Sequence, residues 1–449
     1  MAALADLELP ELDYMDPELR GERFHATMRG LSERTWLARA PLATIVLDRA
    51  AGDHFLKSKA AIFPGLKIAE LFGIGDGPLH EQITRNIINV NGADHRRLRQ
   101  LVGPALSRGA ADRYRPAMRD FLEELWTGVA EHGECDLVEA VAKPYPALTI
   151  ATVMGAPRED APRLHDWSMW IQRQFDPVAL SDPEALARID AKVGEFYAWV
   201  RPLISGRRTT TADDLISSLI AAEEEGDRLS DVELENLVLN VLVGGVDTTQ
   251  SQLAQAVALL AQRPDQWAAL RADPEGLAPA AVEEALRYEP ITPFTARMLV
   301  EDVTYQGVTF PKDTVLMICA FTANRDPDTF ADPQDFDITA ERPTTRMLTF
   351  GAGIHFCLGA NLARAELQEG LAFLARRIER LELAGEPGRQ GVSGIYGLDA
   401  LPVRFVADPR GTRAHVDERP TADELAERAR ARGPGDRDEP SGPGSSARP

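Results

Sequence analysis

The sequence predicts a mainly helical domain with smaller β-sheets, the α+β class, and three observations support this. Apolar residues recur with helix period through most of residues 111–222 and again over residues 230–263. Runs of β-branched residues at 43–48 and between 295 and 318 predict strands. An alanine- and leucine-rich segment at 360–383, typical of a long helix, follows a glycine-rich loop that holds one cysteine.

Composition and charge narrow the class of protein. Of the 449 residues, 44% are hydrophobic and 27% are charged, which is ordinary for a globular protein with a large core. The formal net charge of −21 argues against general nucleic-acid binding and against attraction to an anionic membrane surface. No apolar run reaches the ~18 residues that a membrane span needs, and no signal peptide is visible. Three scattered cysteines suit a reducing compartment, so we expect a cytoplasmic protein, and a monomer.

The two ends of the chain differ from its middle. Residues 1–30 are an acidic, loosely patterned lead-in. Residues 63–92 mix glycine and proline with apolar residues, which indicates loops and short helices that could line a pocket. After a last predicted strand at 401–406, the composition changes to Arg, Asp, Glu, Gly, Pro and Ser, which cannot bury a core. We therefore expect one folded domain at 31–408 and a disordered tail at 409–449.

A basic helix is predicted from Asp94 to Ser107, with Asp94 as its N-cap and a kink or early end at Pro104. His95 and Arg99 are four residues apart on this helix and therefore share one face. These side chains suit a clamp on an anionic group, although a solvated basic face is the commoner reason for such a segment.

The strongest helix prediction covers residues 230–263. A capping box, SDVE, opens this helix, and a proline follows it. Its middle, GGVDTT at 244–249, contains two glycines that each cost about 1 kcal/mol relative to alanine. Polar groups in an apolar stretch add a desolvation cost, which indicates a functional segment where Asp247 and Thr248 handle water or protons. A buried kink with a satisfied polar cluster is the alternative.

A further helix is predicted at 280–288, where Pro279 suits the first position because no N–H is needed there. It carries Glu284 and Arg287, three residues apart on one face. Taken alone, such a pair is typical of a surface salt bridge that contributes little to stability.

The loop at 350–359, FGAGIHFCLG, places Cys357 among three glycines just before the predicted helix at 360–383. Free backbone N–H groups at a helix start favour the thiolate, and glycines let the backbone pass close to a flat ligand. A thiolate that binds haem iron favours O–O cleavage. The alternatives are a small buried hydrophobe, half of a zinc site with His355, and a dinucleotide loop that lacks its third glycine.

These motifs follow one another along the chain in the same order as those of the cytochrome P450 family, and they resemble the soluble bacterial form of that family over nearly all of residues 35–408. The loop at 350–359 resembles the haem-binding loop, LARAE at 362–366 its helical continuation, and GGVDTT at 244–249 the oxygen-activating segment. The resemblance implies this family's triangular prism of helices, with haem b between the long central helix and the cysteine loop.

The resemblance also implies roles for individual residues. Cys357 would bind the iron, and His95, Arg99, Arg297 and His355 would bind the two haem propionates, which need cationic partners. The full set at matching cofactor-binding positions is His95, Arg99, Gly244, Gly245, Thr248, Arg297, Phe350, Gly351, Gly353, His355, Cys357, Gly359 and Ala363. Glu284 and Arg287 would form a buried structural pair that is coupled to Arg325 in the downstream loop.

The implied activity is monooxygenation of a hydrophobic small molecule. One oxygen atom from O2 would enter a C–H bond, with Asp247 and Thr248 supporting protonation of oxygen. We expect electrons from a separate ferredoxin and ferredoxin reductase, because no flavin or iron–sulfur segment is visible. The ferredoxin is expected near Cys357, where the candidate contacts are Arg96, Arg97, Arg108 and Arg346.

Other activities remain open at this point. Epoxidation, oxidative coupling and peroxide-driven chemistry are possible on the same fold, and a haem-based sensor or binder without turnover is an alternative of another class. A peroxide-driven enzyme would not need Asp247 and Thr248, so this pair favours the O2-dependent route.

The substrate is not identified, but the candidate pocket residues are mainly apolar, which suggests a terpenoid, steroid, fatty acid or polyketide. They are Ile68, Leu71, Phe72, Trp170, Leu242, Val243, Ile291, Thr292, Phe294, Ile395 and Tyr396. The family often has an arginine where Tyr396 stands, so we expect Tyr396 to mark a substrate preference.

Overall fold

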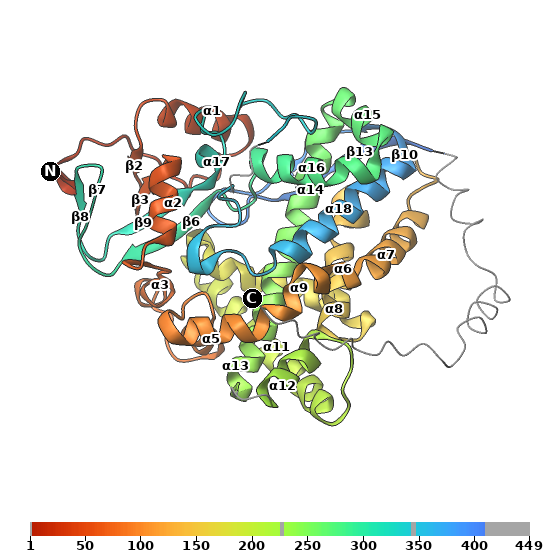
Figure 1. Ribbon diagram of the computed structural model, residues 1–449, viewed down its shortest axis with the longest axis horizontal. Helices are drawn as coiled ribbons and strands as arrows, with labels where there is room; N and C mark the ends of the chain where they lie inside the picture. Colours follow the sequence, from red (N-terminus) through yellow and green to blue (C-terminus); the bar gives the residue numbers. More distant parts are fainter. Residues whose placement is uncertain (1, 225–228, 343–346, 409–449) are drawn as a thin grey trace, which may run out of the picture. The chain divides into compact units, whose positions relative to one another are not determined.

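The structure, a computed structural model, describes residues 2–408 apart from 225–228 and 343–346. It confirms the mainly helical class with smaller β-sheets (Figure 1). One compact unit ends at Ala407, and it includes the lead-in at 1–30. The disorder predicted for 409–449 lies outside the described residues. None of the helices in the described part of the chain is long and apolar enough to cross a membrane.

The helices occupy most of the described chain. They are α1 Gly21–Ser32, α2 Arg49–Lys57, α3 Gly65–Leu71, α4 Pro78–Arg85, α5 Gly92–Val102, α6 Arg108–Arg113, α7 Arg115–Thr127, α8 Pro144–Met154, α9 Ala161–Gln172, α10 Pro177–Leu180, α11 Pro183–Thr209, α12 Leu215–Glu224, α13 Asp231–Gly245, α14 Asp247–Ala261, α15 Pro264–Ala272, α16 Pro274–Tyr288, α17 Ala320–Ala323 and α18 Ala360–Arg377. Short 3₁₀ turns, among them η5 Arg173–Phe175, connect several of them.

Four small sheets complete the unit. The largest has the order β2-β3-β9-β6-β4, in which β3 and β9 are parallel and the other neighbours are antiparallel. The others have the orders β10-β13-β5, β1-β8-β7 and β11-β12. The strands are β1 Ala2–Ala3, β2 Leu37–Arg39, β3 Thr44–Val46, β4 Ala61–Ile62, β5 Glu134–Asp136, β6 Phe294–Leu299, β7 Val303–Tyr305, β8 Val308–Phe310, β9 Val315–Cys319, β10 Ile378–Leu383, β11 Gly388–Arg389, β12 Leu398–Ala400 and β13 Pro402–Ala407.

Three predicted helix boundaries were wrong. Helix α5 begins at Gly92, whose φ of +65° only glycine adopts readily, so Asp94 lies in the first turn and is not the N-cap. Helix α16 begins at Pro274 after the cap of Asp273, and Pro279 lies inside it. Helix α18 ends at Arg377, and the rest of the predicted segment is strand β10, which pairs with β13.

The predicted central helix at 230–263 is two helices, α13 and α14, which meet at Val246. The capping box at Ser230 is confirmed, because the Ser230 N–H donates to the Glu233 carboxylate at 2.8 Å and the Ser230 hydroxyl accepts from the Glu233 N–H at 3.3 Å. At the break, the Thr248 hydroxyl donates to the Gly244 carbonyl. Threonine bonding of this kind bends helices, so the GGVDTT segment breaks the helix that the sequence predicts as continuous.

Helix α14 is the most buried long element of the structure. All its residues except Thr248 are buried, including Gln250, Gln252 and Gln255. It packs against α8, α16 and α18, the last of which follows the cysteine loop (Figure 1). The fold therefore places the helix break and the start of α18 on elements that contact each other.

Candidate active site

The cysteine loop is shaped by its glycines. Gly351 and Gly353 have φ values of +67° and +71°, which only glycine adopts without strain. A Cβ on Gly353 would lie 2.6 Å from the Leu56 carbonyl oxygen, so this glycine also lets the loop lie against α2. The Cys357 N–H donates to the Phe350 carbonyl at 2.9 Å and closes the loop. Two of the three glycines therefore serve the loop's own conformation and packing.

Cys357 stands at the start of α18, as the sequence predicts. Burial raises the pKa of its thiol, while the backbone N–H groups of Gly359 and Ala360 and the Arg99 guanidinium oppose that shift. The net direction is upward, so burial outweighs the groups that favour the thiolate. A metal cation that coordinated this thiol would favour its deprotonated form.

Four basic side chains meet beside this loop from three separate segments. His95 and Arg99 come from α5, Arg297 from β6, and His355 from the loop itself. The His95 and His355 rings are 4.6 Å apart, and Arg99 donates to the Phe356 carbonyl. His95 is 3% exposed, so the alternative of a solvated basic face is wrong for this residue.

The basic cluster has no acid to balance it. Burial, together with Arg297, His95 and Arg99, lowers the pKa of His355 to about 3. Burial lowers the pKa of Arg297 to about 10, and its Nε is buried without a hydrogen-bond partner among the described residues. Within the same described ranges, no carboxylate pairs with any of the four side chains. With both histidine pKa values lowered, Arg99 and Arg297 carry the two uncompensated positive charges, and the two propionates of a haem would balance them.

The helix break provides the second half of the site. Gly244 is exposed between the buried Val243 and the half-buried Gly245, and apart from its own helix backbone and chain neighbours no atom lies within 4 Å of the position of an added Cβ. Gly245 has a different role, because its Cβ would lie 2.4 Å from Ile150 of α8. Asp247 is only 6% exposed, and burial raises the pKa of its carboxyl to about 6, against the opposing effect of Arg173.

These observations fit a thiolate-bound haem. The cation cluster, the N–H groups at Cys357 and the open space beside Gly244 match what such a group requires. Phe350 and Ala363 are both half-buried, and Phe350 lies 4.7 Å from the Arg364 guanidinium. Among the described residues, no group of three or more His, Cys, Asp and Glu side chains could hold a metal ion, so the zinc alternative gains no support.

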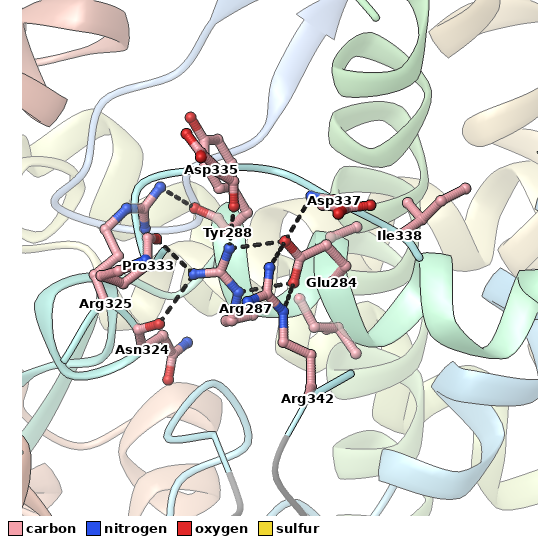
Figure 2. Close-up of polar contacts among 12 residues, drawn as sticks. Glu284, Arg287, Tyr288, Asn324, Arg325, Pro333, Asp335, Asp337, Ile338 and Arg342 are labelled. Carbon is pink, nitrogen blue, oxygen red and sulfur yellow. Dashed lines mark hydrogen bonds and ion pairs between the residues drawn. The ribbon is translucent and has the colours of Figure 1, made fainter. Parts of the chain in front are cut away.

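The predicted pair of Glu284 and Arg287 forms, and it belongs to a larger network of buried polar contacts (Figure 2). Both side chains are 1% exposed, and two hydrogen bonds of 2.8 Å join them. The second cation on Glu284 is Arg342, at 2.6 and 2.9 Å, and not Arg325. Arg325 instead donates to the Tyr288 and Phe321 carbonyls, because it follows α17 and lies on the far side of Arg287 from the carboxylate.

The candidate pocket residues divide into three groups by exposure. Several are partly exposed: Ile68, Leu71, Phe72, Trp170, Thr292 and Ile395. Val243, Ile291 and Phe294 retain 5–7% exposure. Leu242 and Tyr396 are 0% exposed, so neither side chain borders open space.

Tyr396 is a packing residue and not a specificity residue. Its hydroxyl accepts the Gly21 N–H at 2.7 Å, and its ring lies 5.4 Å from that of Phe24. Both partners belong to α1, in the stretch that the sequence predicts as a loosely patterned lead-in. The substrate role expected for Tyr396 is therefore wrong, because a long-range contact with the N-terminal segment occupies the side chain.

Two residues near the site are missed by sequence reasoning. Arg342 lies in a loop rich in proline and aspartate, where nothing local marks it as a partner of Glu284. Glu366 is fully buried on α18, and its carboxylate oxygens accept no hydrogen bond from other described residues. The sequence marks Glu366 only as an acidic residue on the apolar face of a predicted helix.

Comparisons with known proteins agree with this site. The sequence profile described as Cytochrome P450 matches residues 75–275 and 276–391. Luteothin monooxygenase of Streptomyces thioluteus is 37% identical over 401 residues, 89% of this chain and 97% of that protein. A methyl-branched lipid omega-hydroxylase of Mycobacterium tuberculosis is 31% identical over 415 residues, 90% of this chain and 95% of that protein. The crystal structure of CalO2 aligns with a TM-score of 0.81 at 30% identity, covering 88% of this chain and 99% of that chain. The chain therefore belongs to the cytochrome P450 family and is a cytochrome P450 monooxygenase.

Proposed function

We propose that this chain holds haem b through Cys357 and hydroxylates a C–H bond of a hydrophobic small molecule, with oxygen from O2. Electrons come one at a time from a separate ferredoxin and its reductase. The observation that carries the proposal is the cluster of His95, Arg99, Arg297 and His355 beside the cysteine loop, four basic groups with no acid among the described residues. The similarity to a lipid omega-hydroxylase supports hydroxylation.

One set of residues would bind the haem, and a second set would take up and release protons. When bound, a haem with a thiolate ligand supplies the activation of O2. Cys357 provides the thiolate, and the four basic side chains hold the propionates by charge-assisted hydrogen bonds. Asp247, whose pKa is about 6, can take up and release a proton near neutral pH. Thr248, one residue on, offers a hydroxyl beside the open face of Gly244.

The proposal predicts the optical signature of thiolate ligation. The reduced protein with carbon monoxide should show a red-shifted Soret band, and Cys357→His should move that band to the position typical of nitrogen ligation. The spectrum of freshly purified protein is the measurement. If the reduced carbon monoxide complex of folded wild-type protein shows its Soret band at the position typical of nitrogen ligation, thiolate ligation by Cys357 is disproved.

Replacement of Thr248 should separate electron use from product formation. In Thr248→Val the hydroxyl is lost at nearly constant shape, so the fraction of electrons that reaches product should fall by about tenfold or more, with hydrogen peroxide as the alternative product. The ratio of product to NAD(P)H consumed measures this fraction. Thr249→Val is the matched control, because the Thr249 side chain is 2% exposed and its hydroxyl has no partner among the described residues. Equal coupling in the two variants would remove Thr248 from proton handling.

The proposed ferredoxin contacts are revised by the structure. Arg97 is bound to Glu233, so its charge is already engaged. Arg96 and Arg108 are exposed, and they remain the candidates near the cysteine loop. Arg346 lies outside the described residues.

A further inference from the structure

Two arginines stack on one tryptophan at the end of α9. The Arg173 and Arg188 guanidinium groups lie 4.4 and 4.0 Å from the centre of the Trp170 ring. Both arginines are exposed, whereas Trp170 is half-buried against the main core. Among the described residues, no carboxylate forms an ion pair or hydrogen bond with either arginine. In a chain with a net charge of −21, two adjacent cations without an acid are unusual.

This Arg–Trp–Arg cluster (Arg173, Trp170 and Arg188) lies close to the helix break. Helix α9 packs against α13 and α14, and the Ser168 hydroxyl donates to the Leu242 carbonyl at 3.3 Å, two residues before Gly244. Arg173 is near enough to Asp247 to act on its carboxyl, whose pKa is raised mainly by burial. Arg173 of the cluster is therefore within electrostatic reach of Asp247 at the helix break, next to the region that the proposed function assigns to substrate.

Apolar side chains accompany the two cations. The ring of Phe175, on the turn that carries Arg173, lies 5.9 Å from the ring of Phe63, just before α3. Leu71, at the end of α3, is 57% exposed, and Val178 of α10, which follows the turn of Phe175, is 48% exposed. Exposed aliphatic side chains on these segments, together with unbalanced cations, suit a ligand with a hydrocarbon body and one anionic end.

The guanidinium groups of the cluster indicate which kind of anion would bind. A guanidinium that stacks on an aromatic ring keeps its in-plane N–H groups available, and these match the two oxygens of a carboxylate or phosphate. Stacking also fixes the side chain before the ligand arrives, so less entropy is lost on binding.

We propose that Arg173 and Arg188, held by Trp170, bind the anionic end of the substrate, a carboxylate or a phosphate monoester, while its hydrocarbon body extends toward the break at Gly244. The inference rests on the proposed function for its substrate, but the anion site can be tested without turnover. It makes the substrate an amphipathic acid and the two arginines specificity-determining residues.

The test is isothermal titration calorimetry of the purified holoprotein with three probes of equal chain length: decanoate, decyl phosphate and 1-decanol. Wild-type protein should bind at least one anion about tenfold or more tightly than the alcohol. Tighter binding of decanoate identifies a carboxylate site, and tighter binding of decyl phosphate a phosphate site. Arg173→Ala and Arg188→Ala should each reduce the preference, and the double variant should abolish it while binding 1-decanol as before.

Arg163→Ala is the matched control. Arg163 also stacks on a tryptophan of α9, at 4.8 Å from the Trp167 ring, but it is paired with Asp160 at 3.1 Å. Its loss should leave the preference unchanged. No preference for either anion in wild type, or an unchanged preference in the double variant, overturns the proposal. The carbon monoxide spectrum of the same samples tests the proposed function separately. A sample without the red-shifted Soret band would contradict thiolate ligation, whereas the calorimetric preference for an anion tests only the two arginines.

Discussion

Replacing Glu284 with glutamine is expected to destabilise the protein by about 3–5 kcal/mol, a large part of the total stability of a typical domain. The Glu284 carboxylate accepts bonds from Arg287, from Arg342 and from the Asp337 N–H at 2.9 Å. If Glu284 lost its charge, Arg287 would remain a cation that is 1% exposed, and among the described residues no carboxylate would pair with it. Breaking one side of a buried pair costs more than the pair contributes, because the other charge stays desolvated.

The adjacent residue provides the control for this variant. Glu283 pairs with Arg364 at 3.0 Å, but these side chains are 38% and 28% exposed. We expect Glu283→Gln to cost about 1 kcal/mol or less, because water screens a pair of this kind. The yield of haem-loaded protein and the midpoint of urea unfolding measure both variants. Similar midpoints for the two substitutions would show that the buried network is not a main source of stability.

Two glutamates of α18 should respond to pH in opposite ways. Burial raises the pKa of Glu366 well above its usual range, and the nearby Thr149, which opposes the shift, donates its hydroxyl to the Tyr145 carbonyl at 3.1 Å. Glu369, three residues later, accepts from Arg119 at 2.7 Å and from Arg115 at 2.9 Å. Burial tends to raise the pKa of Glu369, but these two arginines outweigh it and the net shift is downward.

The signs follow from linkage between protonation and folding. A carboxyl with a raised pKa in the folded state is penalised above the pKa of the unfolded chain, so the contribution of Glu366 worsens as pH rises. A carboxyl with a lowered pKa stabilises above the unfolded value and loses this contribution as pH falls through its folded pKa, as for Glu369.

Thermal unfolding of the two glutamine variants at about pH 5 and about pH 8 tests these signs. Relative to wild type, Glu366→Gln should gain about 1–2 kcal/mol between the lower and the higher pH, because glutamine cannot ionise. Glu369→Gln should show a nearly constant loss of stability between these two pH values, and this loss should shrink only below the usual carboxyl pKa of about 4.3, where the lowered pKa of Glu369 makes its contribution disappear. A change between pH 5 and pH 8 that is as large for Glu369→Gln as for Glu366→Gln would contradict the assignment. The change with pH is the diagnostic, because any unpaired amide acts equally at both values.

Features that depend on neighbours in the chain were predictable from the sequence. The capping box at Ser230 needs only a serine and a glutamate three residues apart, and it forms as predicted. Gly351 and Gly353 of the cysteine loop adopt the left-handed conformation that glycine permits, whereas Gly359 has a φ of −82°. The unusual residues at 244–249 indicate a disturbed helix, and the structure interrupts the helical pattern at Val246, between α13 and α14.

Features that depend on distant contacts were not predictable in this way. From local pattern, His95 and Arg99 suited a solvated face as well as a clamp, and only the resemblance to a family linked them to Arg297. The partner of Glu284 was assigned to Arg325, whereas the chain path brings Arg342 to the carboxylate. The resemblance to the family predicts a substrate contact for Tyr396, whereas the structure places its hydroxyl against the Gly21 N–H of α1.

The sequence by itself determined the α+β class, the cysteine loop and the disturbed middle of the central helix, because short-range backbone preferences and periodic burial act within a few residues. Only the tertiary structure decided which distant side chains meet: the cation cluster, the second cation on Glu284 and the two arginines on Trp170. The physical reason is that charge balance and desolvation are set by packing between elements, and the path of the loops between them is not encoded in any local pattern.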